Sequence, residues 1–119
     1  MKQYNLDYLK EMSGGDAAFM DEMIGYFLEN SPSVITRLDQ CLQSGDWEGF
    51  RFAIHKFAPN LAIVGLNSLA EMASRLEQLS GVSGDHGLIP ATYDGFRERL
   101  SSALDEMNLD FSHLLKPKS

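Results

Sequence analysis

The side chain in this sequence with the clearest capacity for chemistry is the imidazole of His55. An unprotonated imidazole is a competent nucleophile at neutral pH, and a phosphoramidate formed on it can be passed onward without a cofactor. His55 lies in a helical pattern of apolar residues that runs from Trp47 to Phe57. At about 100° per residue, it falls about 120° from the centre of that apolar stripe. Its ring is therefore predicted to reach solvent, although a lone exposed histidine on a helix is usually an ordinary surface residue.

The other reactive side chains form no recognisable site. His86 lies in a glycine-rich segment and His113 near the C-terminus, and neither has a metal-ligand spacing with Cys41. We therefore interpret both histidines as surface residues and predict no metal site. No glycine-rich phosphate loop, catalytic carboxylate pair or Ser-His-Asp arrangement is detected, which argues against a kinase ATP site and against a self-contained enzyme. Cys41, the single cysteine, is expected to be a buried thiol in a reducing compartment.

Four long apolar patterns, with residues recurring every three or four positions, predict the helices of this chain. The first pattern spans residues 20–42, and a kink or short break is expected at Ser31-Pro32, because proline removes a backbone donor. Gly14-Gly15-Asp16 and Ser44-Gly45-Asp46 are expected to supply the turns and caps around it. The second pattern, which contains the histidine, spans residues 47–64.

The third and fourth patterns carry their own start signals. Ser68-Leu69-Ala70-Glu71 has the sequence of a capping box and predicts the start of the third helix. A glycine-rich loop from Gly81 to Ile89 leads to Pro90, which is suited to a first helical position. The apolar residues of these two helices, expected to face the core, are Leu69, Met72, Ala73, Leu76, Leu79, Tyr93, Phe96, Leu100, Leu104 and Met107.

These patterns predict an all-α fold, because no segment shows the alternation of a strand and no repeat is evident. Four helices joined by short links favour an antiparallel up-and-down four-helix bundle. A short additional N-terminal helix over Leu6 to Met12 is expected to cover one end of it. We expect residues 1–119 to form a single domain, in which 112–119 is a frayed tail.

Composition and charge narrow the possible partners. The 119 residues are 44% hydrophobic and 23% charged, which is typical of an ordinary globular domain. The formal net charge of -7 disfavours binding to nucleic acid or to anionic membranes, and therefore favours protein partners. No apolar run approaches the roughly 20 residues that span a bilayer, and no signal-peptide core is found. We expect a cytoplasmic monomer.

Several residues at fixed distances from His55 form a pattern. The run His55-Lys56-Phe57-Ala58-Pro59 is followed by Gly65, ten residues after the histidine. This pattern resembles the motif of the histidine phosphotransfer (HPt) family, which has an apolar residue two after the histidine, lysine three after, glycine or proline four after, and glycine ten after. Phe57, Pro59 and Gly65 fill these places, whereas Ala58 replaces the lysine thought to stabilise the phosphoryl group. The resemblance covers about residues 5 to 80.

The resemblance implies roles for residues near the histidine. Lys56 and Arg51 are the nearest cations that could replace the missing lysine, although Lys56 points about 100° further around the helix and Arg51 lies one turn back. Glu77 occupies a place where the family often has a glutamine that bonds the imidazole from the adjacent helix. A solvated glutamate is the alternative. Pro59 would clear space for an incoming domain, unless the helix simply ends near Phe57.

The helical positions of residues near His55 also predict a surface for docking. Phe52 is predicted to project beside His55 and to form a docking patch with Glu48, Ala58 and Ala62. The alternative for Phe52 is that a neighbouring helix partly covers it.

The function that the resemblance implies is that of a phosphocarrier in a multistep two-component phosphorelay. His55 would accept a phosphoryl group from the aspartate of one response-regulator receiver domain and pass it to another. A hybrid sensor histidine kinase is a second candidate partner. Mg²⁺ is expected only in the acidic pocket of the receiver, and no cofactor in this chain. The alternative, which Ala58 keeps open, is a phosphorylation-incompetent helical adaptor that binds receiver domains or other proteins.

Overall fold

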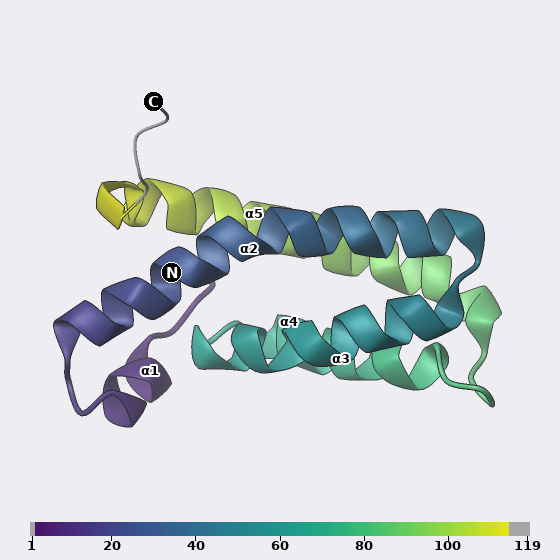
Figure 1. Ribbon diagram of the computed structural model, residues 1–119, viewed down its shortest axis with the longest axis horizontal. Helices are drawn as coiled ribbons and strands as arrows, with labels where there is room; N and C mark the ends of the chain where they lie inside the picture. Colours follow the sequence, from purple (N-terminus) through teal and green to yellow (C-terminus); the bar gives the residue numbers. More distant parts are fainter. Residues whose placement is uncertain (1, 115–119) are drawn as a thin grey trace.

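The computed structural model describes residues 2–114, and these form helices without any strand. The elements are α1 (Asp7–Met12), α2 (Ala17–Ser44), α3 (Trp47–Ile63), α4 (Asn67–Leu79) and α5 (Ile89–Asp110), with short 3-10 turns η1 (His86–Leu88) and η2 (Ser112–Leu114). Helices α2 to α5 run up and down, and each contacts its two neighbours around the bundle (Figure 1). The small helix α1 lies at one end of the bundle. The predicted all-α bundle with a short N-terminal helix is confirmed.

The turns on either side of α2 have the predicted chemistry. Asp16 caps α2 by accepting a hydrogen bond from the backbone N–H of Phe19. Gly45 ends the helix in the left-handed conformation, with φ of 70°, which glycine adopts without strain. Asp46 then caps α3 by accepting from the backbone N–H of Gly49, at 2.9 Å. These caps fix where the helix that carries the histidine begins.

One expectation about helix ends is wrong. The capping box at Ser68 does not form, because α4 already begins at Asn67 and the residue before it, Leu66, is buried and has no capping side chain. Burial of Leu66 in the core sets this helix start in place of a polar cap. Neither proline ends a helix, since α2 continues across Pro32 and α3 across Pro59.

Helix α2 tolerates its internal proline by bending and by using a hydroxyl group. Pro32 cannot donate to the carbonyl group one turn earlier, which weakens the helix locally. The buried Ser31 hydroxyl donates to the carbonyl oxygen of Phe27, at 2.6 Å, a bond that often accompanies helix bends. The first half of α2 runs at an angle to its second half (Figure 1). The expected kink is present, and the expected break is not.

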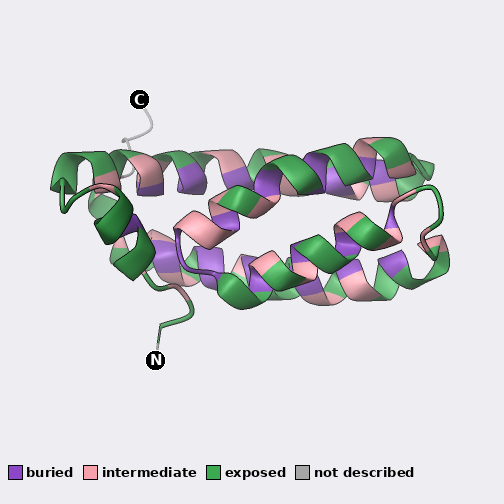
Figure 2. Cartoon of the chain, turned by 90° about the horizontal axis from the view of Figure 1, so that it is seen from below, coloured by how far each residue is buried: buried purple, intermediate pink, exposed green. Residues whose placement is uncertain are grey.

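The core consists of large side chains from all four long helices. Rings of Phe27 and Phe57 stack at 5.9 Å between α2 and α3, and Phe50 meets Tyr93 edge to face at 5.5 Å. Figure 2 shows the buried residues on the facing sides of the helices. Of the predicted core positions in α4 and α5, only Met72 and Leu79 are half-buried, and the other eight are buried.

A polar cluster joins α2 to α5 beside this core. The Tyr93 hydroxyl donates to Asp39, at 2.6 Å, and the Arg97 guanidinium pairs with both oxygens of the same carboxylate. Burial raises the pKa of the Tyr93 hydroxyl far above its usual range, and the hydrogen bond to Asp39 raises it further. Tyr93 therefore stays a neutral donor. Burial also raises the pKa of the Cys41 thiol, the predicted buried cysteine.

The N-terminal segment crosses the corner between α3 and α4 and is tied to α5. The Tyr4 hydroxyl donates to Asp110, at 2.6 Å, and Asn5 N–H donates to the carbonyl oxygen of Val64. At the C-terminus, the expected frayed tail is only partly testable. Residues Ser112–Leu114 form η2 against α5, and 115–119 lie outside the described residues, so fraying of the tail stays a prediction.

Gly65 provides a test of this corner, because it combines a φ of 72° with close packing against the backbone of Asn5. Gly65→Ala should lower the free energy of unfolding by at least about 2 kcal/mol, since a methyl group there would overlap the Asn5 carbonyl. Gly14→Ala is the matched control, with a similar φ of 65° and open space around it, and should cost about 1 kcal/mol. Urea unfolding measures both; equal losses would contradict the packing role.

Candidate functional site

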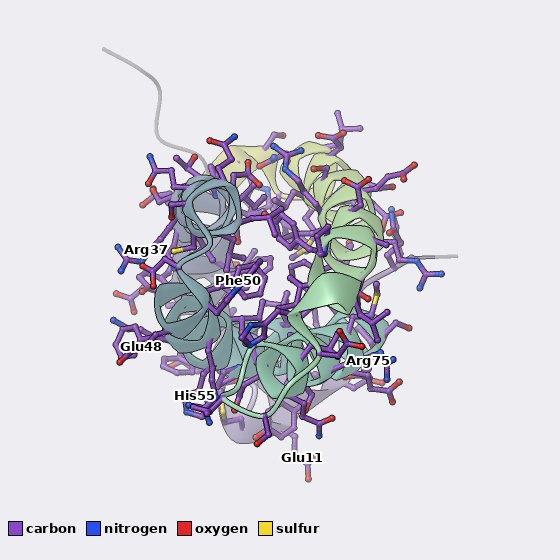
Figure 3. All side chains as sticks on the ribbon, turned by 90° about the vertical axis from the view of Figure 1, so that its right-hand side faces the viewer. Glu11, Arg37, Glu48, Phe50, His55 and Arg75 are labelled. Carbon is purple, nitrogen blue, oxygen red and sulfur yellow. The ribbon has the colours of Figure 1, made fainter. Side chains whose placement is uncertain are left out.

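His55 lies in the middle of α3 with its side chain 72% exposed, and its Nδ1 atom is 2.8 Å from Oε1 of Glu77. The two residues before it, Ala53 and Ile54, are buried, so the opposite side of the helix faces the core. Seen along the bundle, Phe50 points inward while His55 lies on the outside (Figure 3). The ring therefore has one nitrogen held by the protein and its other edge directed to solvent.

Glu77 reaches His55 because α3 and α4 pack antiparallel at the outer edge of the bundle. The glutamate side chain is 26% exposed, and the buried Ala73 and Leu76 fix the inner side of α4 beneath it. Ser80 ends the helix by donating to the carbonyl oxygens of Leu76 and Glu77, at 2.9 and 3.0 Å. The backbone that carries Glu77 is thus held on both sides. The alternative for Glu77, a side chain surrounded by solvent, does not fit its low exposure and its contact with the imidazole.

This contact selects one tautomer of the imidazole. An ionised carboxylate only accepts hydrogen bonds, so Nδ1 carries the proton and donates it to Glu77. The lone pair is then on Nε2, at the solvent side of the ring. A phosphoryl group can be added there without removing a proton first. The carboxylate would also offset the positive charge that the ring gains when Nε2 forms a bond.

The cations expected near the histidine lie on different sides of it. Lys56 is exposed and lines a groove of about 440 Å³ between α2 and α3, here called the α2–α3 groove. Arg51 lines a second depression, here called the His55 hollow, together with His55 and Phe52. The remaining residues of the His55 hollow are Arg37, Asp46, Glu48 and Gly49. Ala58 is half-buried and packs against the core.

Phe52 connects these two depressions. Phe52 is 63% exposed, so a neighbouring helix covers only the smaller part of it. It lines the α2–α3 groove across from Tyr26, which is 56% exposed, and it also lines the His55 hollow. An exposed aromatic ring beside the imidazole, with a second exposed ring across the adjoining groove, is typical of a binding face.

The structure separates some residues that the sequence pattern groups with His55. Gly65 lies at the end of α3, about 15 Å along the helix axis from the histidine, and shapes the corner with α4. Ala62 lines a different depression, shared with Tyr8 and Asn67. Pro59 is exposed one turn after His55, and because it has no N–H, the His55 carbonyl lacks its usual helical donor.

Two residues of this face were missed from the sequence. Tyr26 and Arg37 belong to α2 and lie across from α3, where they line the α2–α3 groove. Their spacing in α2 places them off the apolar stripe, which indicates exposure and nothing more. Only the register of α2 against α3 brings them to the histidine side, and Figure 3 shows Arg37, Glu48 and His55 along one flank of the bundle.

Comparison with known proteins identifies the family. A family model described as Hpt domain matches residues 22–110, which is most of the chain. The chain therefore belongs to the Hpt domain family, and the function of that family is histidine phosphotransfer in phosphorelays, through interaction with receiver domains. The resemblance found in the sequence is confirmed. No curated protein and no solved structure matches the chain significantly.

Two kinds of feature are absent from the part of the chain that the structure describes. Within residues 2–114, no three His, Cys, Asp or Glu side chains are grouped so that they could hold a metal ion. None of the helices described there has the length and apolar character needed to cross a membrane.

The hydrogen bond between His55 and Glu77 can be tested without a partner. Glu77→Leu should remove the preference for a proton on Nδ1, and ¹⁵N NMR of the imidazole should show a mixture of tautomers. Phosphorylation of His55 should slow about fivefold, the effect of losing about 1 kcal/mol of hydrogen bonding. Glu77→Gln, which keeps an acceptor oxygen, is the control. An unchanged tautomer in Glu77→Leu would contradict the role given to Glu77.

Proposed function

We propose that this chain is a phosphorelay shuttle, in which His55 accepts a phosphoryl group from the aspartyl phosphate of one receiver domain and donates it to the aspartate of another. The observation that supports this proposal best is the imidazole that is fixed through Nδ1 and open at Nε2. A group that must enter the active site of another protein has to be exposed, and it reacts faster when a rigid element holds it.

In the proposed reaction, the Nε2 lone pair attacks phosphorus in line with the bond to the aspartate. The N–P bond forms as the P–O bond breaks, and the aspartate leaves as a carboxylate with the bonding electron pair. The Nδ1 proton stays in its hydrogen bond with Glu77 throughout. Donation to the second receiver is the reverse of this step. Mg²⁺ bound by the receiver would neutralise charge on the phosphoryl oxygens, so the chain itself would need no cofactor.

The docking face in this proposal is the α2–α3 groove with the adjoining His55 hollow. Tyr26 and Phe52 supply exposed aromatic surface, and Arg37 and Lys56 supply positive charge. The net charge of the whole chain is -7, so these cations make the face locally unlike the rest of the protein. Such a face complements an acidic receiver pocket and steers its approach. Glu48 and Ala58 would lie at the edges of this contact, and Ala62 further along α3.

We further propose that the chain acts as a monomer in the cytoplasm, where a single buried thiol such as that of Cys41 is stable. Its partners would be receiver domains and, as a second candidate, a hybrid sensor histidine kinase.

A second function is favoured by one specific residue. Ala58 stands where the family motif has lysine, so the chain could bind receivers without accepting phosphate, as an adaptor. The two functions differ in one measurement. After incubation with a phosphorylated receiver, a shuttle carries an acid-labile and base-stable label, whereas an adaptor remains unlabelled and still binds.

The shuttle predicts the behaviour of His55→Gln. This variant should accept no phosphate from the receiver, because it has no nucleophilic nitrogen at this position. Its free energy of unfolding should change by less than about 0.5 kcal/mol, since the side chain is exposed. Labelling and urea unfolding measure the two effects. Label that persists in this variant would rule out His55 as the acceptor.

Phe52→Ala tests the docking face. We expect receiver affinity to fall about 5- to 30-fold, the effect of truncating an aromatic residue at the centre of an interface. Stability should hardly change, because the ring is 63% exposed. Leu109→Ala is the matched control, as it removes an apolar side chain that is 80% exposed on α5. Calorimetric titration with the receiver would compare them; equal affinities of the two variants would place the interface elsewhere.

A further inference from the structure

A phosphoryl group on His55 needs a cation that the family motif does not supply here. The group would carry a charge of about -2 at neutral pH, and Ala58 replaces the lysine of the motif. Three exposed cations lie beside the histidine: Arg37 on α2, and Arg51 and Lys56 on α3. Arg37 lines both depressions, and the two cations on α3 are distinguished by the side of that helix on which each lies.

Lys56 lies on the side of α3 that faces α2. It lines the α2–α3 groove together with Tyr26, Phe57 and Asn60, and does not line the His55 hollow. Glu77, by contrast, approaches the histidine from α4, on the other side of α3. Lys56 is therefore placed to meet a docked protein surface. It is poorly placed to contact a group on the imidazole.

Arg51 lies on the same side of α3 as His55. Residues four apart on a helix are neighbours, with Cβ atoms about 5–6 Å apart. The Arg51 Nε atom is 4.0 Å from the place that a Cβ atom on Gly81 would occupy, so its side chain reaches toward the end of α4. Glu77 lies four residues before Gly81. Arg51 therefore faces Gly81, just beyond the end of α4, in the same way that His55 faces Glu77 one helical turn away.

The Arg51 guanidinium is available for a ligand. Among residues 2–114, no carboxylate lies within ion-pair distance of it. It lines the His55 hollow together with the histidine, and Gly81 has no side chain that would fill the space beside it. The C-terminal end of α4 carries partial negative charge, which attracts the guanidinium in the absence of phosphate. A guanidinium can form two parallel N–H···O bonds with phosphoryl oxygens.

We propose that Arg51 binds the phosphoryl group on Nε2 of His55 and supplies the positive charge that Ala58 cannot. This inference rests on the proposed function, since it requires that His55 is phosphorylated. It assigns Arg51 to the phosphoryl group and Lys56 to the docking face. A purely structural role for Arg51, as a cation at the end of α4, is the competing explanation.

The test uses phosphoramidate, a small phosphoryl donor that needs no protein partner, and follows the hydrolysis of phosphorylated His55. Arg51→Gln should shorten the phosphohistidine half-life about fivefold. Lys56→Gln is the matched control, with the same charge change one residue away, and should leave the half-life unchanged while weakening receiver binding. In the double variant Arg51→Gln with Ala58→Lys, the half-life should return toward that of the native chain, because a lysine one turn beyond His55 can reach the phosphoryl oxygens.

The outcomes separate this inference from the proposed function. If neither phosphoramidate nor a phosphorylated receiver labels His55, the proposed function fails. If His55 is labelled but Arg51→Gln has the native half-life, or shortens it no more than Lys56→Gln does, the inference about Arg51 is wrong. A purely structural role would lower the melting temperature without changing the half-life. Should Arg51→Gln not fold, Arg51→Met keeps the length of the side chain without its charge, and a native half-life in it would equally contradict the proposal.

Discussion

The register between α3 and α4 is the constraint on which the site depends. The buried residues Leu61, Leu66 and Leu69 hold the corner between these helices, and Gly65 allows the chain to turn there against the backbone of Asn5. This corner sets which residues of α3 and α4 face each other, and it places Glu77 opposite His55 and Gly81 opposite Arg51. A shift of one residue would turn the glutamate by about 100° and break its hydrogen bond with the imidazole. The tautomer of His55 thus depends on packing about 15 Å away.

Two prolines inside helices show how the bundle accommodates local strain. Pro32 and Pro59 each remove a backbone donor, yet α2 and α3 continue through them because their apolar faces remain buried on both sides. In α2, the Ser31 hydroxyl bonds to the carbonyl oxygen of Phe27 and the helix bends. In α3, the carbonyl that loses its donor is that of His55 itself, on the exposed side of the helix. Tertiary burial therefore outweighs the local preference of proline to end a helix.

Charge is distributed unevenly over an acidic protein. The net charge is -7, but Arg37, Arg51 and Lys56 gather around the histidine on two neighbouring helices. The α2–α3 groove is lined by Arg37 and Lys56 and by no carboxylate, whereas Asp46 and Glu48 line the His55 hollow. The positive field, which acts over about 8 Å at physiological ionic strength, is therefore centred on the groove. The family model matches a chain with alanine in place of the motif lysine, and the nearby arginine offers a physical reason why the site could tolerate that change.

The sequence by itself determined the helices and the exposure of the histidine. The spacing of Phe50, Ile54 and Phe57 fixes the buried side of α3, and local chemistry at Asp16, Gly45 and Asp46 fixes the ends of α2 and the start of α3. It did not determine the start of α4, because burial of Leu66, a long-range effect, replaced the expected cap at Ser68. Nor could it show that Tyr26 and Arg37 face the histidine side, or that the side chain of Arg51 reaches toward the end of α4. Periodicity gives the direction of a side chain relative to its own helix, whereas its neighbours depend on the register between helices, which only packing of the whole core decides.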